Sequence, residues 1–340
     1  MVITMKHEID LSNYEIRTDL AIESAGNQSK QERFQEDNVT ITKMILSEEE
    51  AKIIGKKKGT YLTIEFVDIT DTQNRKKVET VVVKQLKQLL KEMGMTKESV
   101  VLVVGLGNDK STPDALGPLA IEEVIVTRHL YEIGDVDPHF RNVAAISPGV
   151  MGETGIETIA VIKGVIEEVK PNFVIVIDAL KSSSISRVNK TIQITDAGIH
   201  PGSGVGNKRK EISKETIGVP VIAIGIPTVV DLVTVVSDTV KFMHQHFSYT
   251  KSNYKKPSSK FVVSGTVNYL EKEVTTSSED KVALLGLLGY LTEEELKQLF
   301  IEVLTPVGYN LIVTPKEIDF LIKKLSQMLA SSLNQVLHQL

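Results

Sequence analysis

Cysteine is absent from the 340-residue sequence, which excludes disulfide bonds, thiolate–zinc sites and a cysteine nucleophile. No apolar run is long enough to span a membrane, and the N-terminus lacks the apolar core of a signal peptide. The charges nearly balance, with 39 Lys and Arg against 44 Asp and Glu, so direct binding of nucleic acid is not indicated. These absences predict a soluble, cytoplasmic protein without membrane contact.

Common enzyme motifs are also missing. The sequence has no P-loop, no HExxH helix of zinc proteases and no GxSxG turn of serine hydrolases. Gly105-x-Gly107 begins like a dinucleotide-binding fingerprint, but Lys110 stands where the third glycine belongs. A nucleotide- or partner-binding α/β module is therefore a non-enzymatic alternative that this glycine pair alone supports.

The most informative stretch covers residues 99–118, SVVLVVGLGNDKSTPDALGP. Its unbroken apolar run at 100–104 predicts a strand buried on both faces. A glycine turn and a polar loop with Asp109 and Asp114 follow, and the next pattern predicts one helix from Pro118 to Ile133. Strand, loop and helix in this order are typical of an α/β sheet, which binds ligands at the carboxyl ends of its strands.

Strand and helix patterns alternate from residue 99 to residue 247. The further strands are predicted at 143–146, 173–177, 191–195 and 221–226. This alternation predicts an α/β fold with three layers, in which helices cover both faces of a mostly parallel sheet. Helical patterns after residue 281 predict C-terminal additions, and the polar residues 1 to about 36 predict a mobile arm or a propeptide.

Two aspartates are candidates for catalysis. Asp114 lies in the loop after one buried strand, and Asp178 is expected to cap the carboxyl end of another. Two close carboxylates do not both ionise readily, so one can act as an acid and the other as a base that activates water for attack on a peptide carbonyl. The same pair could instead hold a metal with a histidine such as His200, or each aspartate could simply cap a loop.

Four blocks resemble the spore germination protease family of endospore-forming bacteria. They are GLGNDKSTPDALGP (105–118), ISPGVMGETGIET (146–158), VIVIDALKSSSISRVNKTIQITDAGIHPGSGVGN (174–207) and VPVIAIGIPTVVD (219–231). The resemblance implies a core similar to the peptidases that mature nickel–iron hydrogenases. It also implies a sequence-specific endopeptidase of aspartic type, without a cofactor, whose two aspartates match Asp114 and Asp178. A metal-dependent peptidase that uses the same two residues stays open.

The resemblance further implies a zymogen that removes its own propeptide and assembles as a homotetramer. Its substrates would be the small acid-soluble spore proteins of the forespore and spore core, degraded during germination. Family cleavage sites read Glu, then Ile or Phe, then Ala, with another Glu beyond, and residues 18–23, TDLAIE, are similar with Asp in the first place. We therefore predict self-cleavage between Asp19 and Leu20.

This cleavage site divides the chain into a propeptide at 1–19 and one elaborated peptidase domain at 20–340. The domain has its core at about 99–247 and additions at 36–98 and 248–340. The acidic residues of the family's cleavage sites also give a possible role to the basic loop of Lys208, Arg209 and Lys210, since such side chains suit carboxylate recognition. The alternative for this loop is an ordinary solvated surface.

Overall fold

The computed structural model describes residues 18–26, 29–134, 136–202, 210–253, 277–304 and 311–338. The chain divides into two compact units, of which the larger comprises Arg17–Val230 and Thr314–Leu340 and the smaller includes Asp231–Val313. Within the described ranges, no helix is both long and apolar enough to cross a membrane.

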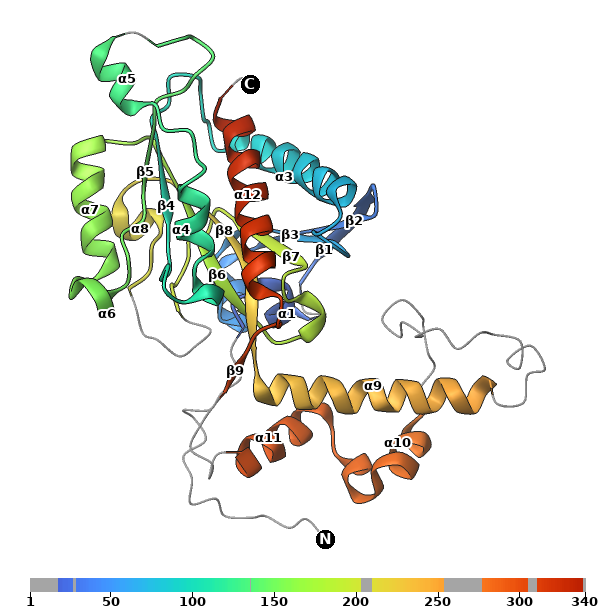
Figure 1. Ribbon diagram of the computed structural model, residues 1–340. Helices are drawn as coiled ribbons and strands as arrows, with labels where there is room; N and C mark the ends of the chain where they lie inside the picture. Colours follow the sequence, from blue (N-terminus) through green and yellow to red (C-terminus); the bar gives the residue numbers. More distant parts are fainter. Residues whose placement is uncertain are drawn as a thin grey trace. The chain divides into compact units, whose positions relative to one another are not determined.

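The larger unit is built on a mixed sheet with the strand order β1-β2-β3-β7-β8-β6-β4-β5 (Figure 1). The strands are β1 Gln31–Glu36, β2 Val39–Leu46, β3 Gly59–Glu65, β4 Val101–Gly105, β5 Val143–Ile146, β6 Phe173–Ser182, β7 Thr191–Thr195 and β8 Val221–Asp231. The strands β5, β4, β6 and β8 pair in parallel, and the other pairs are antiparallel. The predicted α/β sheet is confirmed, and its parallel part lies in the predicted core.

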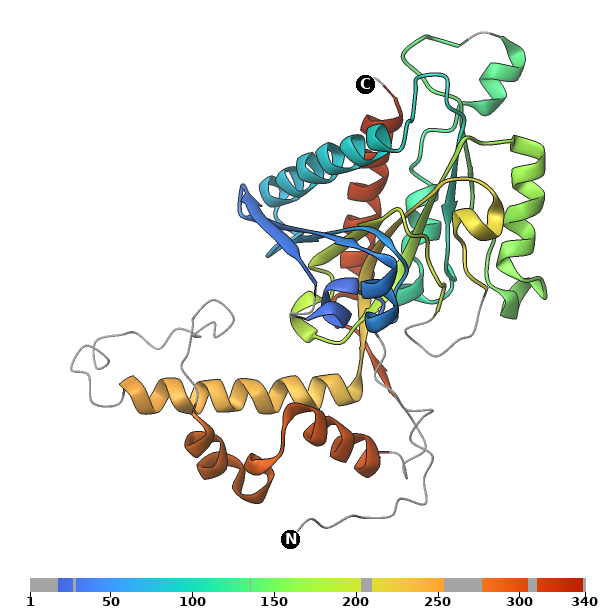
Figure 2. The same cartoon turned by 180° about the vertical axis from the view of Figure 1, so that it is seen from behind.

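Helices cover both faces of this sheet, as the two opposite views show (Figures 1 and 2). The first face carries α3 (Thr72–Glu92), α4 (Leu116–Ile121) and α12 (Ile318–Leu337), and the second carries α7 (Thr158–Val169) and α8 (Lys214–Ile217). In β4, Val101 and Val103 pack in the first layer, whereas Leu102 and Val104 pack in the second. Both sides of the strand are thus buried, which explains its unbroken apolar sequence.

The remaining helices are shorter in the larger unit and longer in the smaller one. The larger unit has α1 (Ala21–Ala25), α2 (Glu48–Ile54), α5 (Arg128–Ile133) and α6 (Met151–Thr154), and the smaller unit has α9 (Leu232–Asn253), α10 (Ser278–Leu285) and α11 (Glu293–Leu304). With α12, the helices from α10 onward are the predicted C-terminal helical additions.

The single helix predicted from Pro118 to Ile133 is wrong. The structure has α4 and α5 instead, and the chain leaves the helical path between them. The Thr127 N–H donates a hydrogen bond to the Val143 carbonyl (2.9 Å), and the Thr127 hydroxyl accepts one from the Val143 N–H (3.0 Å). These bonds to β5 take over the hydrogen bonding that a continuous helix would have made.

The N-terminal region also departs from the expectation of a polar arm up to about residue 36. From Thr18 onward the described chain is ordered against the sheet, with α1 followed by β1. Ala21 and Ala25 of α1 share a small apolar cluster with Met44 and Tyr61, and β1 pairs with β2. Burial of small apolar side chains and pairing with an existing strand explain the order of this region.

Candidate active site

Asp114 lies in a loop that folds back over the end of β4. The backbone N–H of Asn108 donates to Asp114 Oδ2 (3.0 Å), and the Thr228 hydroxyl of β8 donates to the Pro113 carbonyl (2.7 Å). The close approach depends on Gly107, which has φ of +118° and whose absent Cβ would lie 1.9 Å from the Asp114 carbonyl oxygen. A glycine is therefore required where the start of the loop packs against the backbone of Asp114.

Asp178 does not cap a strand, contrary to the expectation. It lies inside β6, which continues to Ser182 because β8 runs beside it in parallel. The neighbour on the other side, β4, already ends at Gly105 opposite Ile177. Asp178 is thus the first residue of β6 beyond the end of β4, and it is 5% exposed. Asp178 of β6 and the loop after β4 that carries Asp114 thus both lie at the carboxyl edge of neighbouring strands.

Asp178 belongs to a row of residues that runs across three strands. Gln193 of β7 is paired with Gly225 of β8, and Gly225 is paired with Asp178. Paired residues on adjacent strands direct their side chains to the same face. Strands lie about 4.8 Å apart, so the Cα atoms of Gln193 and Asp178 are separated by roughly 10 Å. Gly225 between them contributes no side chain, and the Leu180 side chain fills the space where its Cβ would point.

The backbone around the predicted cleavage bond is bound to this row. Gln193 Nε2 donates to the Asp19 carbonyl (3.3 Å), and Gln193 Oε1 accepts a bond from the Ala21 N–H (2.7 Å). Lys56 Nζ donates to the same Asp19 carbonyl (3.2 Å) and to the Thr18 carbonyl (2.8 Å). The carbonyl of the Asp19–Leu20 bond therefore has two side-chain donors, one of them an ammonium group.

The side chains next to this bond are enclosed. Leu20 and Ala21 are fully buried. The Lys181 N–H donates to Asp19 Oδ2 (2.8 Å), and the Asp19 N–H donates to the Lys181 carbonyl (3.0 Å). Burial lowers the pKa of the Lys56 ammonium from its ordinary value, while the carboxylates of Asp19 and Glu23 oppose that shift. The segment of residues 18–23 is consequently held against β6, the strand that carries Asp178, much as a bound peptide would be.

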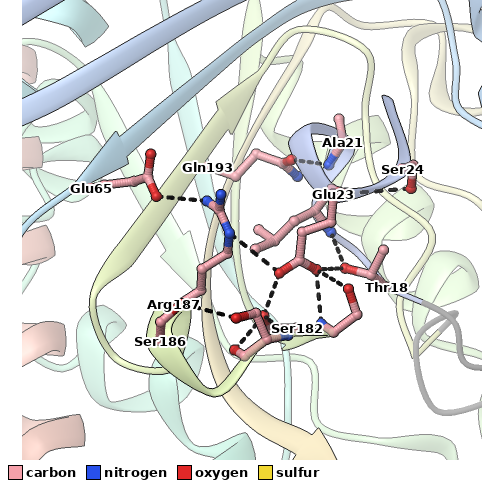
Figure 3. Close-up of polar contacts among 12 residues, drawn as sticks. Thr18, Ala21, Glu23, Ser24, Glu65, Ser182, Ser186, Arg187 and Gln193 are labelled. Atoms are coloured by element: carbon pink, nitrogen blue, oxygen red, sulfur yellow. Dashed lines mark hydrogen bonds and ion pairs between the residues drawn. The ribbon is translucent and has the colours of Figure 1, made fainter. Parts of the chain in front are cut away.

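The carboxylate of Glu23 occupies a polar site that we call the Glu23 pocket, formed by Ser182, Ser183 and Arg187 (Figure 3). The Ser182 hydroxyl donates to Oε1 (2.6 Å), and the Ser183 N–H (2.8 Å) and hydroxyl (3.0 Å) donate to Oε2. Arg187 Nε lies 3.5 Å from Oε1, and the Glu23 side chain is 7% exposed. Such a set of donors is what a carboxylate requires when it leaves water.

Of the basic loop predicted for substrate binding, the structure describes only Lys210. Lys208 and Arg209 lie outside the described residues, and Lys210 is exposed, with its backbone N–H 3.4 Å from Glu157 Oε1. His200 is half exposed and pairs with Glu211 (3.2 Å). In the part of the chain that the structure describes, no three His, Cys, Asp or Glu side chains gather as a metal site. Asp114, Asp178 and His200 therefore do not form the metal-binding group considered from the sequence.

Sequence reasoning missed Lys56, Gln193 and the Glu23 pocket. A signal for the pocket was present, since the polar run Ser182-Ser183-Ser184-Ile-Ser186-Arg187 directly follows an apolar strand. Gln193 is the one polar residue between two isoleucines of β7, which indicates a strand but no function. Lys56 stands in a lysine-rich turn, whose charge pattern is typical of a solvated surface.

Comparisons with known protein sequences match nearly the whole chain. The family model described as germination protease matches residues 7–340. The germination protease of Geobacillus sp. (strain WCH70) is 48% identical over 98% of this chain and 97% of its own length. That of Bacillus cereus (strain AH187) is 49% identical over 98% and 96%, respectively. A solved NiFe hydrogenase maturation protease from Thermococcus kodakarensis covers 42% of this chain and 80% of its own, with 21% identity and a TM-score of 0.28. The chain belongs to the germination protease family, and it is a peptidase.

Proposed function

We propose that the chain is the zymogen of an aspartic-type endopeptidase, which first cleaves its own Asp19–Leu20 bond and then cleaves other proteins with the same machinery. One observation carries this proposal: the Asp19–Leu20 bond is bound, through Gln193, on the sheet face that also presents Asp178. The sequence of residues 18–23 suggested this bond as the cleavage site, and the contacts of its backbone support the same bond independently.

The proposed reaction uses water as the nucleophile. One carboxylate of the pair Asp114 and Asp178 takes a proton from water, whose oxygen forms a bond to the Asp19 carbonyl carbon. The other, protonated carboxyl group gives its proton to the Leu20 nitrogen as the C–N bond breaks, so that an acid end and an amine end result. The proposed reaction thus requires that the pair carries one proton between its two carboxyl groups.

The negative charge that develops on the Asp19 carbonyl oxygen needs donors that are already in place. Lys56 and Gln193 supply them in the uncleaved chain. Donors aimed at a developing oxyanion in a site with little water are worth more than the same donors in solution. The two residues thus have the positions of an oxyanion hole for this one bond.

The proposed substrates after processing are small acid-soluble spore proteins, cleaved in the core of the germinating spore by a homotetramer of the mature chain. This part of the proposal rests on the family to which the chain belongs. The acidic residues of the family's cleavage sites agree with the carboxylate contacts that the docked residues Asp19 and Glu23 make.

N-terminal sequencing of the matured protein tests the proposed processing site. We expect the first residue to be Leu20. The variant Leu20→Glu should abolish processing, because a carboxylate at this fully buried position has a large desolvation penalty. Ile22→Gln is the matched control, since its side chain is only partly buried, and it should mature at a rate within about threefold of the parent. A mature protein that starts at another residue contradicts the proposal.

A further inference from the structure

The Glu23 pocket binds a carboxylate that lies four residues beyond the Asp19–Leu20 bond and outside the sheet. Its three donors to Glu23 at 2.6–3.0 Å come from Ser182 and Ser183, at and just after the end of β6. Arg187, in the short turn Ile185–Arg187 that follows, adds a positive charge. Hydrogen bonds to ionised groups are the strongest kind that side chains make, so the pocket discriminates a carboxylate from a neutral amide of the same size.

The donors of the pocket also have partners other than Glu23. Arg187 Nη1 lies 2.8 Å from the Glu65 carboxylate of β3, which holds the guanidinium in place from the side opposite Glu23. The Ser182 hydroxyl is bound by the backbone N–H of Ser184 (3.0 Å). Both groups therefore have partners besides Glu23, and such partners favour a fixed orientation of the donors.

The path of the docked chain links the pocket to the cleaved bond. Asp19 is bound to Lys181 through its backbone and its carboxylate, and the chain then enters the helical turn of α1. That turn brings Glu23 back beside Thr18, whose hydroxyl contacts it. A peptide bound in this way is extended up to the residue after the cut and helical beyond it, and its fourth residue after the cut lies in the Glu23 pocket.

We propose that Ser182, Ser183 and Arg187 form the specificity subsite that reads an acidic side chain at the fourth position after the cleaved bond, first in the chain's own Glu23 and then in substrates. The inference rests on the proposed function, since it takes the docked segment as a model of the substrate. It assigns carboxylate recognition at this position to residues other than Lys208, Arg209 and Lys210, whose predicted role stays a prediction.

Binding of uncleavable peptides tests the subsite apart from catalysis. The probes have the sequence of residues 14–27 with a reduced Asp–Leu bond, one with Glu and one with Gln at position 23, and each is titrated against the processed enzyme. We expect the Glu peptide to bind at least tenfold more tightly. In Arg187→Gln and in Ser183→Ala, which leaves the Arg187–Glu65 pair intact, this preference should fall below threefold. Arg128→Gln, which changes a residue that pairs with Glu132 of its own helix and with the Val169 carbonyl, should keep it.

The outcomes separate the subsite from the proposed reaction. An undiminished preference for Glu in both pocket variants overturns the subsite. If the Glu peptide is preferred but its ordinary counterpart is not hydrolysed between Asp and Leu, the proposed function fails and the subsite stands. In the full chain, Glu23→Gln should slow self-cleavage at least tenfold, whereas Glu49→Gln, at an exposed position of α2, should have no effect.

Discussion

Replacement of Asp178 or Asp114 by asparagine is expected to leave a folded protein whose kcat for peptide cleavage is lowered by at least about 10³-fold, because each residue supplies half of the proposed acid–base pair. Asparagine has nearly the same size as aspartate, and at position 114 its side-chain oxygen can still accept the bond from the Asn108 N–H. The loop over β4 should therefore persist. The measurement is hydrolysis of a peptide with the sequence of residues 14–27, together with self-cleavage of the full chain.

Two controls make this result specific. Asp137→Asn changes an exposed aspartate that bonds His139 and should keep parental activity. Excess EDTA should leave the parent active. If EDTA abolishes the parent's activity and an added divalent metal restores it, the two aspartates are metal ligands, and if both asparagine variants stay active, the assignment of the site is wrong.

Gly107→Ala is expected to have the largest effect on stability, lowering the free energy of unfolding by about 2–4 kcal/mol. The new Cβ would lie 1.9 Å from the Asp114 carbonyl oxygen, and the backbone at φ of +118° is unfavourable for alanine. The clashing atom belongs to the backbone, so relief requires the whole loop to move and Asp114 with it. Urea unfolding with an unchanged m-value is the measurement, and peptide hydrolysis should fall in parallel.

The variant Gly94→Ala separates the two causes of the expected loss of stability, the clash of the new Cβ and the unfavourable backbone conformation. Gly94 also has a positive φ, of +87°, but nothing lies within 4 Å of the position of its Cβ. It should therefore lose only the backbone contribution, about 1 kcal/mol. Equal losses for the two variants would mean that the loop over β4 is not held as tightly as the structure shows.

The layers of the fold and the carboxyl edge of the sheet could be predicted because both follow from short stretches of sequence. The apolar runs of β4 and β6 each require burial on both sides, whatever their neighbours are. The length of β6 could not be predicted, since the strand reaches Ser182 only because β8 runs beside it. The division of one predicted helix into α4 and α5 likewise depends on the bonds of Thr127 to β5.

Residues of the candidate site could be predicted only where a reactive side chain also stands at a telling place in the sequence, such as the end of an apolar run. Asp114 and Asp178 stand out because acidic residues follow or interrupt buried strands. Lys56 and Gln193 contact the same carbonyl of Asp19, but they are far apart in the chain and each is unremarkable in its own neighbourhood. Contacts of this kind follow from the pairing of β3 with β7 and of β7 with β8, which no local pattern determines.

The burial of Leu20 would make the proposed cleavage hard to reverse. In the intact chain its nitrogen is an amide whose N–H is bound by the Thr18 hydroxyl (3.1 Å). Cleavage at Asp19–Leu20 would turn it into an ammonium group at a fully enclosed position, next to the positive charge of Lys56. Burial disfavours an ionised amine, so we expect the new end to move into water once the acid end has left. Once the two new ends had separated, the cut could not easily be resealed.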